Sequence, residues 1–248
     1  MQHYFTDENL SVNQTFQVSD DIAHHFMSVL RSGEGNQFEI VDASHQLFIA
    51  EIIDEENNTA SVVSQRESDV ELPIQATIIC GLPKKEKAEL IVQKATELGV
   101  SKVIFVPTEW AIAKWKNKAD KKIQRLAKIA KSAAEQSHRN VIPVVEYINS
   151  LKELSEIEFD HKLIAYEESA KQGEKSDLIK TIEKTNDGET IAMFFGPEGG
   201  ISPKEVSFLS EKGYQTCGLG PRILRTETAP FYFLSALSVC KELNLYNK

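Results

Sequence analysis

The feature that most constrains the fold is an alternation of two kinds of segment after Pro73. Short apolar runs with strand character occupy residues 77–82, 103–106, 163–166 and 190–195, and segments of helical character occupy residues 85–98, 119–137 and 176–184. Strands that alternate with helices are the signature of βαβ units, which place their strands parallel to one another. The sequence therefore predicts an α/β fold with a parallel sheet for this part of the chain.

The first seventy residues have a different pattern. Three strand-like segments, 37–42, 46–53 and 59–65, are separated by short turns rich in Gly, Asp, Asn and Glu. Strands at such close spacing favour a small antiparallel barrel. We therefore expect two domains, one at residues 1–72 and one at residues 73–248.

Composition excludes several classes of protein. The three cysteines, Cys80, Cys217 and Cys240, form no C-x-x-C pair and no metal-binding pattern with the six histidines. We therefore expect no disulfide framework and no metal site. The first residues lack a signal-peptide pattern, and no apolar run approaches the roughly 18 residues of a membrane span. These features predict a cytoplasmic protein without a membrane partner.

A first glycine-rich turn follows the apolar run 190–195. Gly196, Gly199 and Gly200 would allow positive φ angles and a close approach of the backbone to a ligand. The sequence Ser202-Pro203-Lys204-Glu205 then predicts a capping box with proline at the first helical position, so that free N–H groups face the turn. The pattern matches neither the dinucleotide fingerprint nor the P-loop, and a purely structural turn is the alternative.

A second turn follows the strand-like run 214–219 and precedes a predicted helix at 226–243. It contains Arg222 and Arg225, with Glu227 at the start of the helix. The two guanidinium groups could be solvated, could be paired with Glu227, or could bind an anionic substrate. We expect the two turns to be neighbouring loops at the carboxyl ends of parallel strands, where open α/β sheets bind ligands.

The net charge of −9 argues at first against a nucleic-acid partner, but the cations are clustered. Between residues 114 and 139 only Asp120 and Glu135 oppose a run of basic residues: Lys114, Lys116, Lys118, Lys121, Lys122, Arg125, Lys128, Lys131 and Arg139. Trp110 and Trp115 lie beside the run, and Lys84, Lys85 and Lys87 could extend it. The run is either a solvated helix face or the basic stripe of an RNA-binding protein.

Several motifs together resemble a known family. G-P-E-G-G at 196–200, followed by L-G-P-R-I-L-R-T-E-T-A at 219–229, resembles the SPOUT class of RNA methyltransferases. The closest resemblance is to the RsmE type, which methylates N3 of a uridine in 16S ribosomal RNA of the small subunit. Residues 84–99, the E-Q-S segment at 135–137 with Arg139, and the H-x-x-x-V-L-R pattern at 25–31 resemble the same family, so that the likeness covers nearly the whole chain.

The resemblance implies a fold and a cofactor. The N-terminal barrel would be PUA-like, and the SPOUT domain would contain a trefoil knot at about residues 163–230. The methyl donor would be S-adenosylmethionine, which the family holds with three loops. Carried onto this sequence, the donor-binding residues are Tyr166, Glu167, Gly196, Pro197, Glu198, Gly199, Gly200, Leu219, Gly220, Ile223 and Leu224.

The resemblance also implies an RNA surface and a homodimer formed through the C-terminal helix. The RNA-binding residues would be His3, Arg31, Lys84, Lys121, Lys122, Lys128 and Arg139. One position departs from the family, which usually has an arginine where this chain has His3. A histidine is mostly neutral at pH 7, so it would bind phosphate more weakly than the arginine.

Methyl transfer requires that the uracil N3 lose its proton. Arg222 or Arg225 would stabilise the charge that develops on the base, and Glu227 is either a base or a structural carboxylate at the helix start. Two alternatives to the uridine methyltransferase stay open. One is a SPOUT ribose 2′-O-methyltransferase acting on transfer or ribosomal RNA, and the other is an RNA-binding assembly factor without catalysis.

Overall fold

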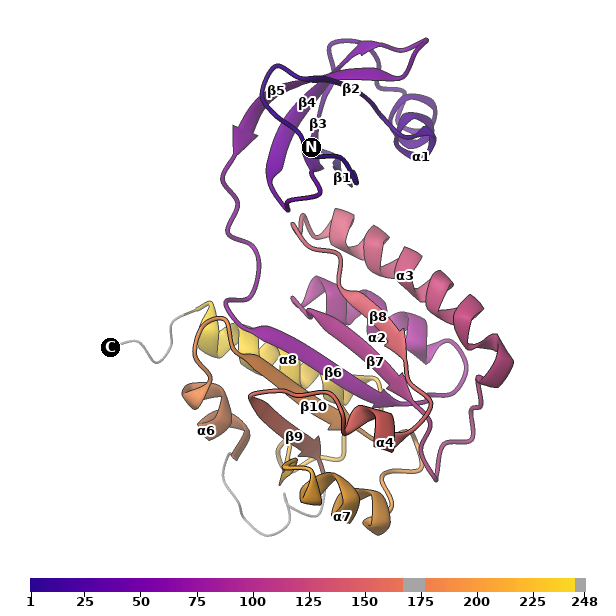
Figure 1. Ribbon diagram of the computed structural model, residues 1–248, viewed down its shortest axis with the longest axis vertical. Helices are drawn as coiled ribbons and strands as arrows, with labels where there is room; N and C mark the ends of the chain where they lie inside the picture. Colours follow the sequence, from indigo (N-terminus) through magenta and orange to yellow (C-terminus); the bar gives the residue numbers. More distant parts are fainter. Residues whose placement is uncertain (167–176, 244–248) are drawn as a thin grey trace. The chain divides into compact units, whose positions relative to one another are not determined.

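The computed structural model describes residues 1–166 and 177–243 (Figure 1). The chain divides into two compact units. The first comprises Met1–Glu71 together with Ala134–Val141, and the second comprises Leu72–Ala133 and Ile142–Lys248. The short segment 134–141 thus joins a unit from which it is distant in the sequence.

The first unit contains a five-stranded sheet in the order β1-β3-β4-β5-β2. The strands are β1 (His3–Phe5), β2 (Thr15–Gln17), β3 (Gln37–Val41), β4 (Leu47–Asp54) and β5 (Thr59–Arg66), with a short helix α1 (Asp20–Ala23) and a π-helical turn η1 (His24–Val29) between β2 and β3. The side chain of Ser19 caps α1 by accepting a hydrogen bond from the Ile22 N–H. In the core of this unit Tyr4 packs edge to face against Phe26 and Phe38, whose rings are tilted relative to each other.

The three predicted strands are confirmed as β3, β4 and β5, which pair antiparallel. The sequence did not indicate β1 and β2, which have only three residues each. Because β1 pairs parallel with β3, the sheet is mixed and differs from the expected all-antiparallel barrel. A three-residue strand carries too few alternating positions to be recognised from periodicity.

The second unit contains a six-stranded sheet in the order β11-β9-β10-β6-β7-β8, in which every pair is parallel. Its strands are β6 (Gln75–Gly81), β7 (Lys102–Val106), β8 (Val144–Tyr147), β9 (His161–Ala165), β10 (Thr190–Phe195) and β11 (Gln215–Cys217). The parallel α/β sheet predicted from the alternation is confirmed. The sequence did not indicate β8, and it lies at the edge of the sheet.

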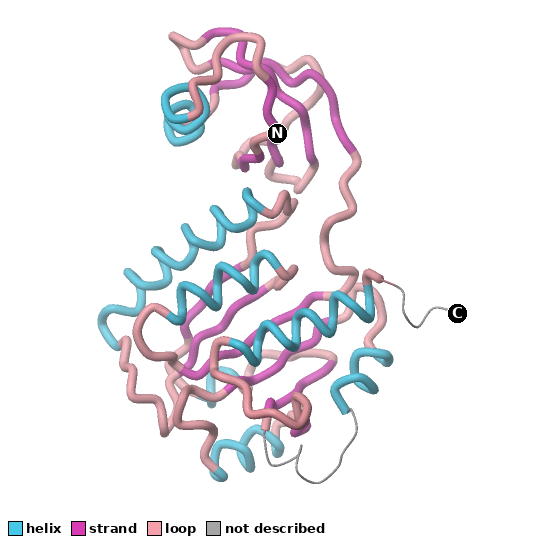
Figure 2. Tube along the Cα trace, turned by 180° about the vertical axis from the view of Figure 1, so that it is seen from behind, coloured by secondary structure: helices cyan, strands magenta, loops and turns pink. Residues whose placement is uncertain are grey.

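Helices cover both faces of this sheet (Figures 1 and 2). They are α2 (Lys87–Glu97), η2 (Lys116–Lys118), α3 (Ala119–Gln136), α4 (Leu151–Leu154), α6 (Asp177–Lys184), α7 (Pro203–Glu211) and α8 (Thr228–Lys241). Ile78 and Cys80 of β6 face α2, α3, α6 and α8, whereas Ile79 between them faces α4 and α7. Successive strand residues point to opposite faces, so a strand buried on both sides is apolar throughout.

The two glycine-rich turns follow β10 and β11 at the carboxyl ends of parallel strands, as expected. Strand β9 lies between these two strands. None of the described helices is long and apolar enough to cross a membrane. The trefoil knot expected at about 163–230 stays a prediction, since strand order does not specify how a chain is threaded.

Candidate active site

The three predicted donor-binding loops begin at the carboxyl ends of β10, β9 and β11, which are neighbours in the sheet. Residues 196–200 follow β10, Tyr166 follows β9, and residues 218–227 follow β11. The Tyr166 N–H donates to the Cys217 carbonyl at 3.0 Å, which joins the second and third loops directly. Glu167 lies outside the described residues. The sheet topology thus gathers the loops at the edge where α/β proteins bind ligands.

The glycines of the first turn have different roles. Gly200 adopts a positive φ of 81°, as expected. Gly196 and Gly199 do not have positive φ; instead they lack room for a side chain. A Cβ on Gly199 would lie 2.8 Å from the Trp110 carbonyl oxygen, and one on Gly196 would lie 2.8 Å from Cγ1 of Ile201. The close approach at these two positions is therefore to the protein itself.

The predicted capping box is present at the start of α7. The Ser202 hydroxyl accepts from the Glu205 N–H, and the Glu205 carboxylate accepts from the Ser202 N–H. The other carboxylate oxygen of Glu205 accepts from the Glu109 N–H at 2.7 Å. One glutamate therefore ties the turn after β10 to the loop after β7, and Pro197 is buried in that junction against Gly81.

Lys87 connects the two glycine-rich turns. Its ammonium lies 3.0 Å from Oε1 of Glu198 in the first turn and 2.9 Å from Oε2 of Glu227 in the second. The Lys84 N–H also donates to Glu198. Although burial acts to raise the pKa of both carboxyl groups, Lys87 holds the pKa of Glu198 and of Glu227 below the usual range. In return the two carboxylates raise the pKa of Lys87.

The second turn presents its arginines to solvent. Gly220 has a φ of 91°, and Arg222, Ile223 and Arg225 are exposed, Ile223 to 80%. Leu219 and Leu224 are half-buried. The described ion-pair partner of Glu227 is Lys87, where the sequence had offered Arg222 or Arg225. This pairing favours the structural role for Glu227, and both arginines are exposed.

The middle part of the basic run lies on α3. Lys121, Arg125 and Lys128 recur at the helical period and are exposed, whereas Leu126, Ala130 and Ala133 are buried on the opposite side. The Lys122 ammonium lies 5.4 Å from the ring centre of Trp115, which is buried, and Trp110 is exposed. Arg125 pairs with Glu89 of α2 at 2.9 Å. The helix therefore displays a cationic surface, named here the α3 stripe: Lys121, Lys122, Arg125 and Lys128.

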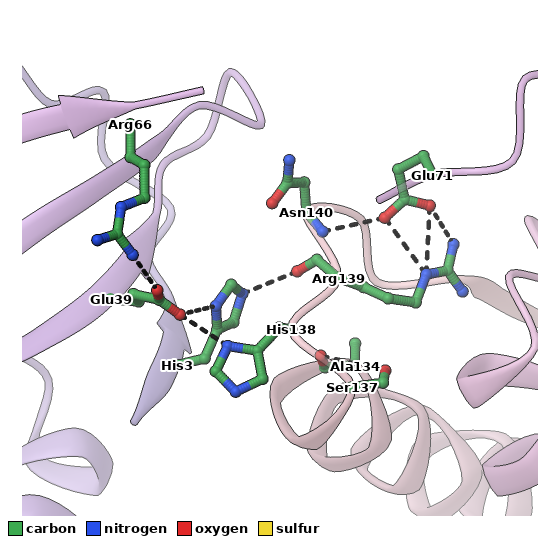
Figure 3. Close-up of polar contacts among 9 residues, drawn as sticks. All are labelled: His3, Glu39, Arg66, Glu71, Ala134, Ser137, His138, Arg139 and Asn140. Carbon is green, nitrogen blue, oxygen red and sulfur yellow. Dashed lines mark hydrogen bonds and ion pairs between the residues drawn. The ribbon is translucent and has the colours of Figure 1, made fainter. Parts of the chain in front are cut away.

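Two residues predicted to bind RNA are buried in the first unit (Figure 3). His3 is 3% exposed and bonds to Glu39 and to the Arg139 carbonyl oxygen. The Arg139 side chain is 4% exposed and donates to the Glu71 carboxylate. Their RNA-binding assignment is corrected to a structural one, because a phosphate cannot reach groups that are buried and paired. Arg31 is exposed, at a φ of 57°, and Lys84 is half-buried.

Sequence reasoning grouped Lys87 with the basic run and missed its role. A signal was present, since a lysine at the first position of a helix opposes the helix dipole and needs a local anion. Which anions these are depends on two turns more than a hundred residues away in the chain.

Comparison with known proteins agrees with this architecture. A family model described as an RNA methyltransferase domain matches residues 70–238, and one described as an RNA methyltransferase PUA domain matches residues 18–63. The ribosomal RNA small subunit methyltransferase E of Bacillus subtilis is 42% identical over 98% of both chains. The protein of that name from Synechocystis is 30% identical and covers 88% of this chain and 71% of its own.

Two solved structures are also similar. The ribosomal RNA small subunit methyltransferase E of Neisseria gonorrhoeae, bound to S-adenosylmethionine, has a TM-score of 0.83 at 28% identity and covers 97% of this chain and 98% of its own. A methyltransferase of Legionella pneumophila in complex with the same cofactor has a TM-score of 0.82 at 28% identity, covering 96% and 97%. The chain belongs to the ribosomal RNA small subunit methyltransferase E family.

Proposed function

We propose that this protein transfers a methyl group from S-adenosylmethionine to N3 of a uridine in 16S ribosomal RNA. One observation carries the proposal: the three donor loops meet at the ends of consecutive strands, and Lys87 joins two of them. Family membership supplies the reaction class, and the two similar structures contain the donor. The reaction takes place in the cytoplasm, where ribosomal RNA is available.

The loops fit the chemistry of this donor. Apolar side chains that are half-buried or exposed, Leu219, Ile223 and Leu224, lie in the same loop as backbone N–H and C=O groups that could contact an adenine edge. The Thr108 hydroxyl, next to Gly81 and Pro197, is buried without a hydrogen-bond partner among the described residues. These residues, with Tyr166 and Gly196–Gly200, would hold the donor.

S-adenosylmethionine supplies an electrophilic methyl group on a sulfonium centre. The protein must hold the uracil N3 close to that group and in line with it. As N3 loses its proton, negative charge develops on O2 and O4 of the base. Arg222 is suited to stabilise this charge, because it is exposed in a turn that Gly220 and Pro221 constrain.

The α3 stripe and Arg31 would bind the RNA backbone, since exposed cations neutralise phosphates. The protein would act as a homodimer. Tyr232 and Val239 of α8 lie seven residues apart on one helix face and are 42% and 38% exposed, and Leu90 of the adjoining helix α2 is 41% exposed. Such a set of apolar side chains is suited to a partner subunit.

The proposal is tested on 16S ribosomal RNA from cells that lack the protein. We expect 3-methyluridine to be absent from the digested RNA, and to return when purified protein and S-adenosylmethionine are added to the subunits. A 2′-O-methylated nucleoside in its place would support the ribose methyltransferase. An unchanged nucleoside profile, with no donor binding by calorimetry, would support an assembly factor.

A further inference from the structure

Three potential metal ligands converge in the first unit (Figure 3). They are Nδ1 of His3 on β1, a carboxylate oxygen of Glu39 on β3, and Nδ1 of His138 in the segment after α3. The His3 nitrogen lies 3.2 Å and the His138 nitrogen 2.7 Å from Oε2 of Glu39. All three ligand atoms lie within 4.8 Å of one another.

The hydrogen bonds around His3 show that a positive species is needed between His3 and Glu39. Nε2 of His3 lies 2.8 Å from the Arg139 carbonyl oxygen, which can only accept, so Nε2 must carry the proton. In the neutral imidazole Nδ1 then has a lone pair, and this lone pair faces a carboxylate oxygen. Two acceptors 3.2 Å apart in a buried position repel each other unless a proton or a metal ion lies between them.

The hydrogen bonds and the burial around these three side chains are those expected of a metal site. A ligating histidine usually donates its other ring N–H to a carbonyl or carboxylate, as Nε2 of His3 does. Arg66 binds the other oxygen of Glu39, Oε1, at 3.0 Å and leaves Oε2 for the two histidines. The His3 side chain is fully buried and that of Glu39 is 9% exposed, whereas that of His138 is 48% exposed and provides an entry path.

We propose that His3, Glu39 and His138 bind a divalent transition-metal ion of the Zn²⁺ type. Two imidazole nitrogens and a carboxylate suit this ion, with water as the fourth ligand. Metal–ligand bonds of about 2.0–2.1 Å in a tetrahedron place two ligand atoms about 3.3–3.4 Å apart. His3 already meets this spacing, and His138, which is half-exposed, needs to withdraw by only about 0.6 Å.

The ion would join the segment 134–141 to strands β1 and β3 of the same unit. Its role is structural, because no residue of the donor loops takes part in it. The inference is therefore independent of the proposed methyl transfer. The competing occupant of the same space is a proton, which would make His3 an imidazolium paired with Glu39.

The test uses the full chain without a polyhistidine tag, treated with a chelator and then titrated with Zn²⁺ at pH 7.5. We expect one equivalent to bind, a rise in melting temperature, and a tetrahedral visible spectrum when Co²⁺ replaces Zn²⁺. His138→Ala, which removes a half-exposed ligand, should weaken the binding of Zn²⁺ at least about 100-fold. Glu39→Gln, which keeps the shape of the side chain, should do the same.

His24→Ala is the matched control, because His24 is an exposed histidine of the same unit outside the cluster. It should leave the affinity for Zn²⁺ unchanged. The proposal is overturned if the wild-type protein binds no Zn²⁺ beyond what His138→Ala binds. It is also overturned if His138→Ala and His24→Ala bind the ion equally well, and a melting temperature that depends on pH but not on Zn²⁺ would assign the position to a proton.

Discussion

Gly200 and Gly188 are turn glycines on either side of β10 with nearly equal φ angles of 81° and 82°. A Cβ on either would have room, since its nearest neighbour is 3.9 Å away at Gly200 and beyond 4 Å at Gly188. Alanine at either position should therefore cost about 1 kcal/mol of folding free energy from the backbone alone. Only Gly200 lies in a predicted donor loop, so only Gly200→Ala should weaken donor binding, by about tenfold.

Calorimetry with S-adenosylmethionine and thermal melting of both alanine variants will check this prediction. Equal donor affinities in the two variants would show that the turn after β10 does not contact the donor.

Lys87 pairs with one carboxylate in each of the two turns and so holds them together. Lys87→Met should lower donor affinity by about tenfold, because it leaves two half-buried carboxylates without a counter-charge. Lys94→Met is the control on the same helix. Its partner Glu97 lies in the last turn of α2, and exposed pairs of this kind contribute less than about 1 kcal/mol. A donor titration of both variants distinguishes a bridge between the turns from a general loss of charge.

The Lys87 bridge also predicts a pH dependence. The pKa values of Glu198 and Glu227 are lowered on folding, so their contribution to stability is present above the ordinary glutamate pKa and is lost as the pH falls through the lowered values. The pKa of Lys87 is raised, so its contribution is lost only above the ordinary lysine range. The melting temperature should therefore be flat near neutral pH and fall in acid, and the acid loss should be smaller in Lys87→Met, which lacks the ion pairs.

Arg222 and Arg225 are both exposed, and they are expected to differ in function. Arg222→Lys keeps the charge but loses the planar guanidinium, so it should lower the single-turnover rate about tenfold or more with donor affinity unchanged. Arg225→Lys, nearer to the start of α8, should affect stability and donor binding together. Rate, affinity and melting temperature of both variants decide between the roles, and a pure stability loss in Arg222→Lys would refute the catalytic assignment.

At the scale of the element, the α3 stripe allows the charge of a helix to be changed without altering its packing. The triple variant of Lys121, Lys122 and Lys128 to glutamate changes exposed positions only, so the fold and donor affinity should be unaffected. RNA binding should weaken, and the slope of log affinity against log salt should fall by about 2 as three phosphate contacts are lost. The control is a triple variant with the same net charge, in which three exposed lysines elsewhere are changed to glutamate: Lys152, Lys184 and Lys212. Equal salt slopes in both triple variants would show that the α3 stripe is an ordinary solvated helix face that does not bind RNA.

At the scale of the whole molecule, the prediction concerns assembly. Val239→Glu places a charge on the exposed apolar face of α8 and should convert a dimer to a monomer in sedimentation experiments. Val144→Glu is the control, since Val144 is similarly exposed on the edge strand β8. A wild-type protein that sediments as a monomer at micromolar concentration would contradict the proposed homodimer.

Local patterns were sufficient for much of this molecule. Apolar runs predicted β3–β7, β9, β10 and β11, and the Ser202–Glu205 capping box predicted the start of α7, because these features depend only on neighbouring residues. The glycine-rich motifs also located two turns at the carboxyl ends of β10 and β11, and their role as donor loops stays a prediction. The strands β1 and β2 were missed, since three residues show no period, whereas the equally short β11 lies inside the predicted run 214–219.

Contacts between distant segments were decided only by the tertiary structure. Four features join residues from separate parts of the sequence. They are the position of β9 between β10 and β11, the Lys87 bridge, the close approach of Gly199 to Trp110, and the burial of His3 and Arg139. The residue type of a lysine or histidine does not indicate which group it will contact in the folded protein. Its protonation, exposure and role follow from which groups the folded chain places within a few ångströms, and that proximity is a property of the packed core.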